Sequence, residues 1–212
     1  MTTGPEYEIS ARAYLGRARA LLAGRAEGEK LFYAAYELRC CVEARQLQYA
    51  LALGPHFKGK VKVHKLVETK NRLQRVYDPS RITYLEMQFS PDEPIYQFYY
   101  TPVTEHLVKE TSKLGEYLHC SKMYRKASDP WWDTLRAQLS SVYKAAWIAC
   151  KGNLWVPPLW NPVTQEVASL KVDGDDPSLG EKLSACQATG TRILVKVDYL
   201  STPPPEWEYD FT

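Results

Sequence analysis

The stretch LFYAAYELRCCVEA, residues 31–44, decides the fold. Ten of its first twelve residues are apolar, and no proline interrupts the segment around it. In a helix, such a stretch places apolar side chains on nearly every side, which is typical of a helix buried inside a protein. We therefore predict that residues 29–53 form the central helix of a bundle. We expect this helix to end at the Gly54-Pro55 pair, a common helix terminator.

Three charged residues, Glu37, Arg39 and Glu43, interrupt this apolar stretch. Arg39 and Glu43 are four residues apart and share a face of the helix. A buried charge that loses its partner costs about 3–5 kcal/mol, so these groups must pair with each other or with neighbouring helices. The candidate partners on a later helix are Lys113, Tyr117 and His119. One interpretation is an ion pair that fixes the register of the helices. The other is a pocket in which Arg39 binds an anion and Glu43 or His119 acts as acid or base.

Four more helices are predicted around the central one. The first covers residues 10–25, with Ser10 as its N-cap, and another covers 61–77. A helix capped by Thr101 or Thr104 should follow, and a last one should begin at Ser128 or Asp129 and end near residue 152. Between them, we expect residues 82–101 to form a short helix, a loop and an extended stretch.

Composition indicates one soluble globular domain with a small annex. The chain has 212 residues, of which 45% are apolar and 25% charged, as in ordinary globular proteins. No run reaches the roughly 18 apolar residues that cross a bilayer. The first ten residues do not resemble a secretory signal, so we expect a cytoplasmic protein without a membrane partner. The five cysteines include no C-x-x-C pair, which favours reduced thiols and no metal site.

Charge and texture change together near Gly152. Residues 1–149 contain 22 Lys and Arg against 16 Asp and Glu, whereas residues 150–212 contain 5 against 9. The later residues form short segments separated by Pro, Gly and Asp, and 192–200 alternate as a half-buried strand does. We predict a mainly α protein with α+β character overall. Its parts are a five-helix bundle over 8–150, a small β-rich annex over 153–201 and an extended acidic, proline-rich tail over 202–212.

The segments YLGRARALLAG and LFYAAYELRCCVEA make up most of the first two predicted helices, within residues 10–53. In these segments the chain resembles the HEPN superfamily of small helical bundles. Members are frequent in antiviral defence, toxin–antitoxin pairs and RNA processing, and many are metal-independent ribonucleases that act as dimers. Their nuclease signature is an arginine followed after four to six residues by a histidine. None of the four histidines here has it; the nearest approach is Lys113 before His119, and lysine lacks the planar fork of arginine.

A strongly basic run, HFKGKVKVHKLVETKNRLQR, covers residues 56–75. Its cations are Lys58, Lys60, Lys62, Lys65, Lys70, Arg72 and Arg75, against Glu68 alone. The run is either a solvated helix face or a surface that contacts a phosphate backbone. Two aromatic groups, IYQFYY at 95–100 and the Trp131-Trp132 pair, could stack on RNA bases but more commonly serve packing.

Three functions follow from these observations. The first is a non-catalytic, HEPN-like accessory or binding protein, from a bacterial defence or toxin–antitoxin system, that contacts RNA or a protein partner through the basic face. The second is a ribonuclease of non-standard chemistry that uses Arg39, Glu43 and His119. The third is a structural subunit that forms a homodimer. The sequence lacks the phosphate-binding and dinucleotide-binding glycine motifs, so we expect no nucleotide or other cofactor.

Overall fold

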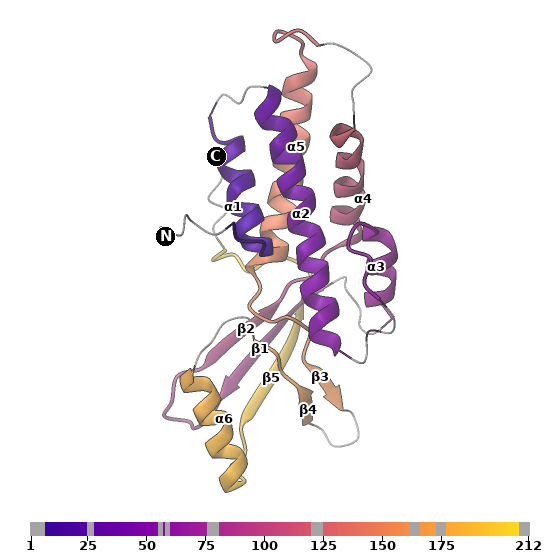
Figure 1. The fold of residues 1–212 in the computed structure, drawn as a ribbon. Helices are drawn as coiled ribbons and strands as arrows, with labels where there is room; N and C mark the ends of the chain where they lie inside the picture. The colour runs from indigo at the N-terminus through magenta and orange to yellow at the C-terminus, as the bar shows by residue number, and fades with distance from the viewer. Residues whose placement is uncertain are drawn as a thin grey trace, which may run out of the picture. The chain divides into compact units, whose positions relative to one another are not determined.

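The computed structural model describes residues 7–24, 28–54, 57, 60–75, 81–119, 125–161, 166–172 and 177–207. The fold is α+β and mainly helical (Figure 1). The chain divides into two compact units. The helical unit contains the described residues before 80, residues 103–150 and Trp207, and the sheet unit contains residues 81–102 and the described residues of 151–206.

The helical unit is built around one long helix. Its elements are α1 (Ala11–Leu22), α2 (Gly28–Leu53), α3 (Leu66–Leu73), α4 (Glu105–Leu114), the 3-10 helix η2 (Gly115–Leu118) and α5 (Trp131–Lys151). Helix α2 packs against α1, α3, α4 and η2, which confirms the predicted central helix (Figure 1). The Ser10 cap is also confirmed, because its hydroxyl accepts a hydrogen bond from the Ala13 amide at 3.1 Å.

Small side chains allow α1 and α2 to approach closely. Ala18 of α1 and Ala34 and Ala35 of α2 are completely buried, and Leu38 lies in the core beside them. Truncation of a leucine buried in this way costs about 2–5 kcal/mol, so this seam contributes a large share of the stability of the unit. The middle of α2 contacts the last turn of α5, where the Sγ atoms of Cys41 and Cys150 lie 3.6 Å apart.

Two predicted helices are shorter than expected. Helix α3 begins only at Leu66, because β-branched Val61 and Val63 have low helix propensity and Lys65 provides no side-chain cap. Val67, in the second position of α3, is 51% exposed. Helix α4 begins at the predicted Thr104 cap and changes to the 3-10 helix η2 at Gly115.

The sheet unit contains an antiparallel sheet of β1 (Ile82–Gln88), β2 (Tyr96–Tyr100) and β5 (Leu194–Leu200) in the order β2-β1-β5. The short helix expected within 82–101 is therefore wrong. Thr83, Leu85 and Met87 are buried at every second position, which is the period of a strand. The predicted strand at 192–200 is confirmed as β5. Strand β1 lies within the range that the sequence assigns to the bundle, but it pairs with β5, more than 100 residues later.

In its described residues, the rest of the sheet unit contains two more short strands and one helix. Strands β3 (Leu159–Asn161) and β4 (Glu166–Ser169) form a two-stranded sheet, and a helix that we did not predict, α6 (Pro177–Thr189), follows them. Lys182 of α6 pairs with Glu93 in the loop between β1 and β2. Of the predicted tail, Pro204 is buried, and residues 208–212 lie outside the described part of the chain.

Candidate functional site

The three charges of the central helix are paired, as predicted. Glu37 is only 9% exposed, and its carboxylate accepts a hydrogen bond from Arg17 Nε at 3.0 Å and one from the Tyr7 hydroxyl at 3.4 Å. Arg39 Nε donates to Glu43 Oε1 at 2.9 Å. The two ion pairs lie on different sides of α2. Glu37 joins α2 to α1, whereas Arg39 faces α3 and α4.

One backbone oxygen and one glycine lie against the Arg39 guanidinium. Its Nη2 donates to the backbone oxygen of His64 at 3.5 Å. Its Nη1 lies so close to Gly115 that a Cβ atom on that residue would collide with it. The guanidinium is therefore held between α2, the residues that precede α3 and the end of α4, while about a quarter of the side chain stays exposed.

The predicted partners on the later helix do not reach this pair. Lys113 pairs with Glu110 at 2.7 Å, and the Tyr117 hydroxyl donates to Gln138 at 2.8 Å. His119 is exposed just beyond η2. Within the described part of the chain, the structure therefore brings Arg39 and Glu43 together and leaves His119 apart from them.

Arg39 and the basic run line the same pocket. The pocket has a volume of about 640 Å³ and lies between α2, α3 and α4. Its cationic side chains are Arg39, Lys65, Arg72 and Arg75, with His64 beside them. Two acids face these four cations: Glu68 in the wall and Glu43, which is bonded to Arg39. The pocket therefore has an excess of positive charge together with neutral donors, Asn71 and Ser112.

The cations of the pocket differ in how firmly they are held. Arg72 Nη1 donates to the backbone oxygen of Lys60 at 2.7 Å, and its guanidinium lies 4.0 Å from the centre of the Phe57 ring. Lys65 and Glu68 form an exposed pair at 3.3 Å, which contributes little stability. Arg75 is exposed, and its side chain has no partner among the residues described here. An anion in this pocket would therefore contact two arginines, Arg39 and Arg72, that backbone oxygens hold in place. It would also contact two exposed cations, Lys65 and Arg75, that are held less firmly.

The remaining residues of the basic run have different positions. Lys60 and Lys62 are exposed immediately before α3. Lys70 is only 7% exposed and pairs with Glu105 at 3.5 Å, so it joins α3 to α4 and is not part of the exposed basic surface. Lys58 lies outside the described residues.

A second pocket, of about 900 Å³, lies between α1, α2 and η2. Arg17, Glu37 and four aromatic side chains line it, and sequence reasoning missed it entirely. The four aromatic residues come from two helices, and no local pattern indicates that Tyr117 of η2 lies opposite Phe32, Tyr33 and Tyr36 of α2.

The aromatic residues that could stack on bases serve packing. The Trp131 and Trp132 rings have centroids 5.0 Å apart, and Phe32 packs against both. In β2, Phe98 and Tyr100 are buried, and Tyr99 stacks on Tyr84 with centroids 4.8 Å apart.

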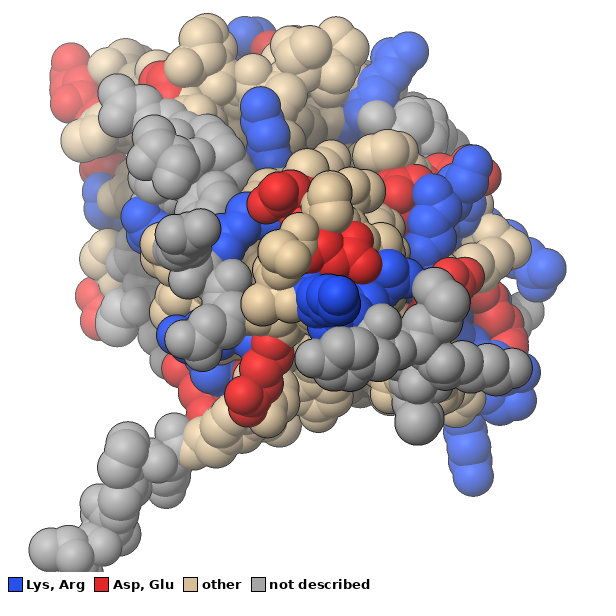
Figure 2. All heavy atoms as spheres, turned by 90° about the horizontal axis from the view of Figure 1, so that it is seen from above, with Lys and Arg blue, Asp and Glu red and all other residues tan. Residues whose placement is uncertain are grey.

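Positive charge is not spread over the whole unit. Figure 2 views the structure from the end at which α5 begins, and Lys and Arg alternate with Asp and Glu over this face. Among the described residues, Lys and Arg therefore form no patch of a single sign on this end of the structure. No group of three or more His, Cys, Asp or Glu side chains in the described ranges could hold a metal ion. None of the helices in these ranges is long and apolar enough to cross a membrane.

No protein-family model matches this chain. No curated protein and no solved structure shows significant similarity to it. The resemblance to the HEPN superfamily therefore stays a prediction from residues 10–53.

Proposed function

We propose that this chain is a non-catalytic binding protein that holds RNA through the basic pocket beside α3. The observation that supports this proposal is that Arg39 lines one pocket with Lys65, Arg72 and Arg75. Following the resemblance, we place it among HEPN-like accessory proteins of bacterial defence or toxin–antitoxin systems.

The arginines of the pocket suit phosphate. A guanidinium presents a planar set of donors that can bind two oxygens of one phosphate. Arg39 and Arg72 are already oriented by backbone oxygens, so little side-chain freedom is lost when an anion binds. The exposed Lys60 and Lys62 extend the basic surface along the chain, so successive phosphates of a strand have cations to contact.

Binding is favoured over cleavage by the position of His119. The alternative ribonuclease would need this imidazole beside Arg39 and Glu43 to move a proton. His119 is not among the residues that line the Arg39 pocket, and Glu43 is bonded to Arg39 itself. No comparable observation favours the third function, a structural dimer.

The test is a titration of a fluorescently labelled single-stranded RNA of about 20 nucleotides, followed by anisotropy at several salt concentrations. We expect affinity to fall steeply between about 50 and 200 mM salt. Arg39→Gln, Arg72→Gln and Arg75→Gln should each weaken binding and reduce the salt slope by about one. Lys30→Gln is the matched control, because Lys30 is an exposed cation on α2 that does not line the pocket.

Two outcomes would contradict the proposal. One is an absence of binding at about 50 mM salt, where phosphate contacts are strongest. The other is an equal affinity for the three pocket variants and the Lys30→Gln control. The RNA should also be run on a denaturing gel after incubation: we expect it to stay intact, and cleavage that Arg39→Gln abolishes would support the ribonuclease instead.

A further inference from the structure

The pocket between α1, α2 and η2 has the walls of a small-molecule site. Four rings, those of Phe32, Tyr33, Tyr36 and Tyr117, line it together with Leu21 and Leu118. Its volume of about 900 Å³ falls within the roughly 300–1,000 Å³ of pockets that bind small molecules. Such pockets are mainly apolar and contain a few polar groups that orient the ligand.

Several of these apolar side chains are unusually exposed. Tyr33 is 55% exposed, Tyr36 49% and Leu118 37%. Large apolar side chains gain free energy when they leave water, and three of them here face one hollow. A ligand with a flat apolar surface would cover them.

The polar part of the wall is the pair of Arg17 and Glu37. Both oxygens of the Glu37 carboxylate are engaged, one by Arg17 and the other by Tyr7. Arg17 Nη1 donates to the backbone oxygen of Glu8 at 2.9 Å, and the rings of Tyr7 and Tyr14 flank its guanidinium at 4.2 and 4.6 Å.

One donor of this arginine is not used. Arg17 Nη2 is buried and has no hydrogen-bond partner among the residues that the structure describes. A buried, unpaired donor on a charged group is costly and requires an explanation. Both carboxylate oxygens of Glu37 have hydrogen-bond donors, whereas Arg17 has one donor without an acceptor. The group that this wall could still bind is therefore a hydrogen-bond acceptor and not a cation.

We propose that this pocket binds a flat aromatic molecule that bears one anionic group. The rings and leucines would cover its aromatic part, and the anionic group would lie against the partly exposed Arg17 guanidinium. Because Nη2 itself is covered in this structure, its hydrogen bond to the ligand requires a small rotation of the Arg17 side chain. A cationic ligand does not fit this charge pattern, because Arg17 already occupies the carboxylate of Glu37. The proposal is independent of RNA binding at the basic pocket, since the two pockets share no lining residue.

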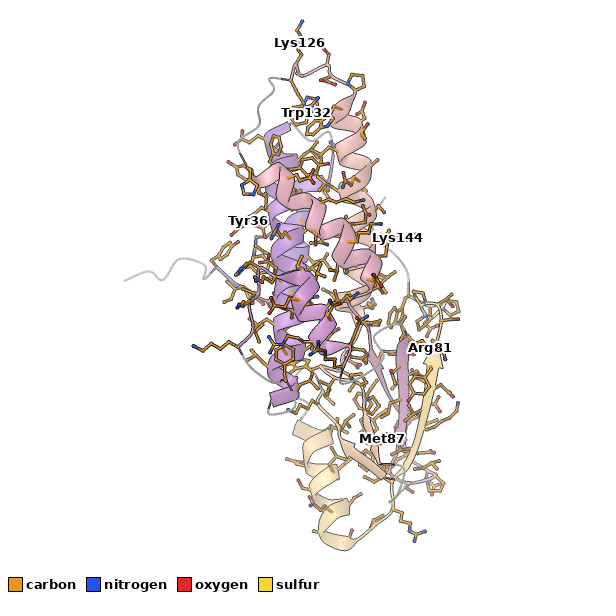
Figure 3. The ribbon with its side chains drawn as sticks, turned by 90° about the vertical axis from the view of Figure 1, so that its right-hand side faces the viewer. Tyr36, Arg81, Met87, Lys126, Trp132 and Lys144 are labelled. Atoms are coloured by element: carbon orange, nitrogen blue, oxygen red, sulfur yellow. The ribbon has the colours of Figure 1, made fainter. Side chains whose placement is uncertain are left out.

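The two tryptophans provide an internal reporter of binding. The Trp132 ring lies 5.7 Å from that of Phe32, and the Trp131 ring lies 5.8 Å from that of Tyr117, measured between centroids. Figure 3 labels Trp132 at the start of α5 and Tyr36 further along the helical unit. A ligand that contacts Phe32 and Tyr117 should therefore change the tryptophan fluorescence.

The probe for the test is 1-anilinonaphthalene-8-sulfonate, which is aromatic and anionic. Its neutral analogue N-phenyl-1-naphthylamine has the same rings without the sulfonate. We expect the sulfonate probe to bind the full chain in a saturable manner at one site, about tenfold more tightly than the neutral analogue, since a tenfold ratio corresponds to one added hydrogen bond to a charged group. Tryptophan fluorescence should change with the same dissociation constant.

Variants assign the binding to this pocket. Tyr36→Ala removes an exposed ring from the wall and should weaken both probes about tenfold, whereas Tyr199→Ala, an exposed tyrosine of the sheet unit, should leave both unchanged. Arg17→Gln should abolish the preference for the anionic probe. Because that change disturbs an ion pair, Arg17→Lys, which keeps the charge, serves as a second variant and should retain part of the preference. Near-ultraviolet circular dichroism verifies that each variant is folded.

Three results would overturn the proposal: binding that does not saturate at one site, equal affinity for the two probes, or unchanged binding by Tyr36→Ala. Arg39→Gln and Arg75→Gln should bind the sulfonate probe as the wild type does. The RNA affinity of these two variants therefore tests the basic pocket, and their probe affinity tests the aromatic pocket.

Discussion

The orientation of Arg39 depends on a residue without a side chain. Gly115 has an ordinary right-handed helical φ of −55°, so its backbone does not require glycine. A Cβ there would instead collide with Arg39 Nη1, the flexible end of a long side chain. We expect Gly115→Ala to displace Arg39 while leaving the melting temperature nearly unchanged, because alanine is the better helix former. RNA affinity should fall about as far as in Arg39→Gln.

Gly16→Ala is the control for this substitution. Gly16 lies within α1, and a Cβ on it would meet no atom within 4 Å. This variant should gain about 0.5–1 kcal/mol of stability and bind RNA as the wild type does. If Gly115→Ala also leaves RNA affinity unchanged, then the position of Arg39 does not matter for binding.

Arg45 is the largest fully buried side chain of the described chain, and it caps a helix. Its Nε donates to the backbone oxygen of Ala149 at 2.9 Å, in the last turn of α5, where backbone oxygens lack helical partners. We expect Arg45→Ala to cost roughly 3 kcal/mol, since it removes a charged hydrogen bond and opens a cavity. Urea unfolding measures the loss. Arg12→Ala is the comparison, because exposed Arg12 makes the equivalent bond to Cys150, and it should cost under about 1 kcal/mol.

At the scale of residues, the sequence predicted that a charge must be paired or a helix end capped more reliably than it predicted which residue would be the partner of a charge. The caps Ser10 and Thr104 were predicted because a cap acts within its own turn. The sequence predicted that Glu37 and Arg39 would each have an oppositely charged partner, because ionised groups in an apolar helix require one. That Arg17 would meet Glu37 was not predictable, since the choice depends on which helix packs against that face.

At the scale of elements, the packing of α2 begins with a close contact. A Cβ on Gly28 would lie 2.5–2.9 Å from atoms of the Trp132 ring. That ring is fixed by its Nε1 bond to the backbone oxygen of Lys126 at 2.9 Å and by Phe32. We expect Gly28→Ala to cost about 1–3 kcal/mol through overpacking, measured by thermal unfolding. Gly180→Ala in α6 meets no atom within 4 Å and should not destabilise.

The elements that sequence reasoning missed were set by distant contacts. In β1, Leu85, Glu86, Met87 and Gln88 favour a helix by propensity, but β5 pairs with every residue of this strand. Strand propensity depends on such pairing more than on the backbone itself. Helix α6 was missed because Gly180 and Pro177 weaken its pattern, while Lys182, which anchors it to Glu93, lies far from that partner in sequence.

At the scale of the whole molecule, the change in composition near residue 150 coincides with the end of α5 at Lys151. The division into units is nevertheless discontinuous, because residues 81–102 join the sheet unit. That segment has the same composition as the later part of the sheet unit, because it contains one arginine against three acids and three prolines in 22 residues. Charge and proline content therefore change at this segment as well as near Gly152, but the segment is short and the chain returns to the helical unit after it.

Several thiol and phenol groups across both units are held in their protonated forms. A hydrogen bond with Cys40 is the largest cause that raises the pKa of Tyr36 to about 12. Burial, followed by its hydrogen bond to Glu86, raises the pKa of Tyr84 strongly. The contact with Cys150 and then burial raise the pKa of Cys41 well above its usual range. Burial likewise raises the pKa of Tyr14 and Tyr99.

These shifts predict a loss of stability at alkaline pH. In the unfolded chain, thiols ionise near 9 and phenols near 10, whereas the folded chain keeps the protons to higher pH. Above pH 9 the folded state therefore binds more protons than the unfolded state. The contribution of these groups to the free energy of unfolding is fully present below pH 9, and it is lost as the pH rises through their pKa values in the folded chain. A buried group such as Cys41 that ionises only on unfolding contributes a slope of up to about 1.4 kcal/mol per pH unit, and half-exposed Tyr36 contributes less because solvent screens its charge. We expect the urea midpoint to be constant from pH 7 to 8.5 and to decrease from pH 9.5 to 11, with tyrosinate absorbance appearing together with unfolding. Tyr84→Phe should make this decrease shallower, and a midpoint that stays constant to pH 11 would contradict the assignment.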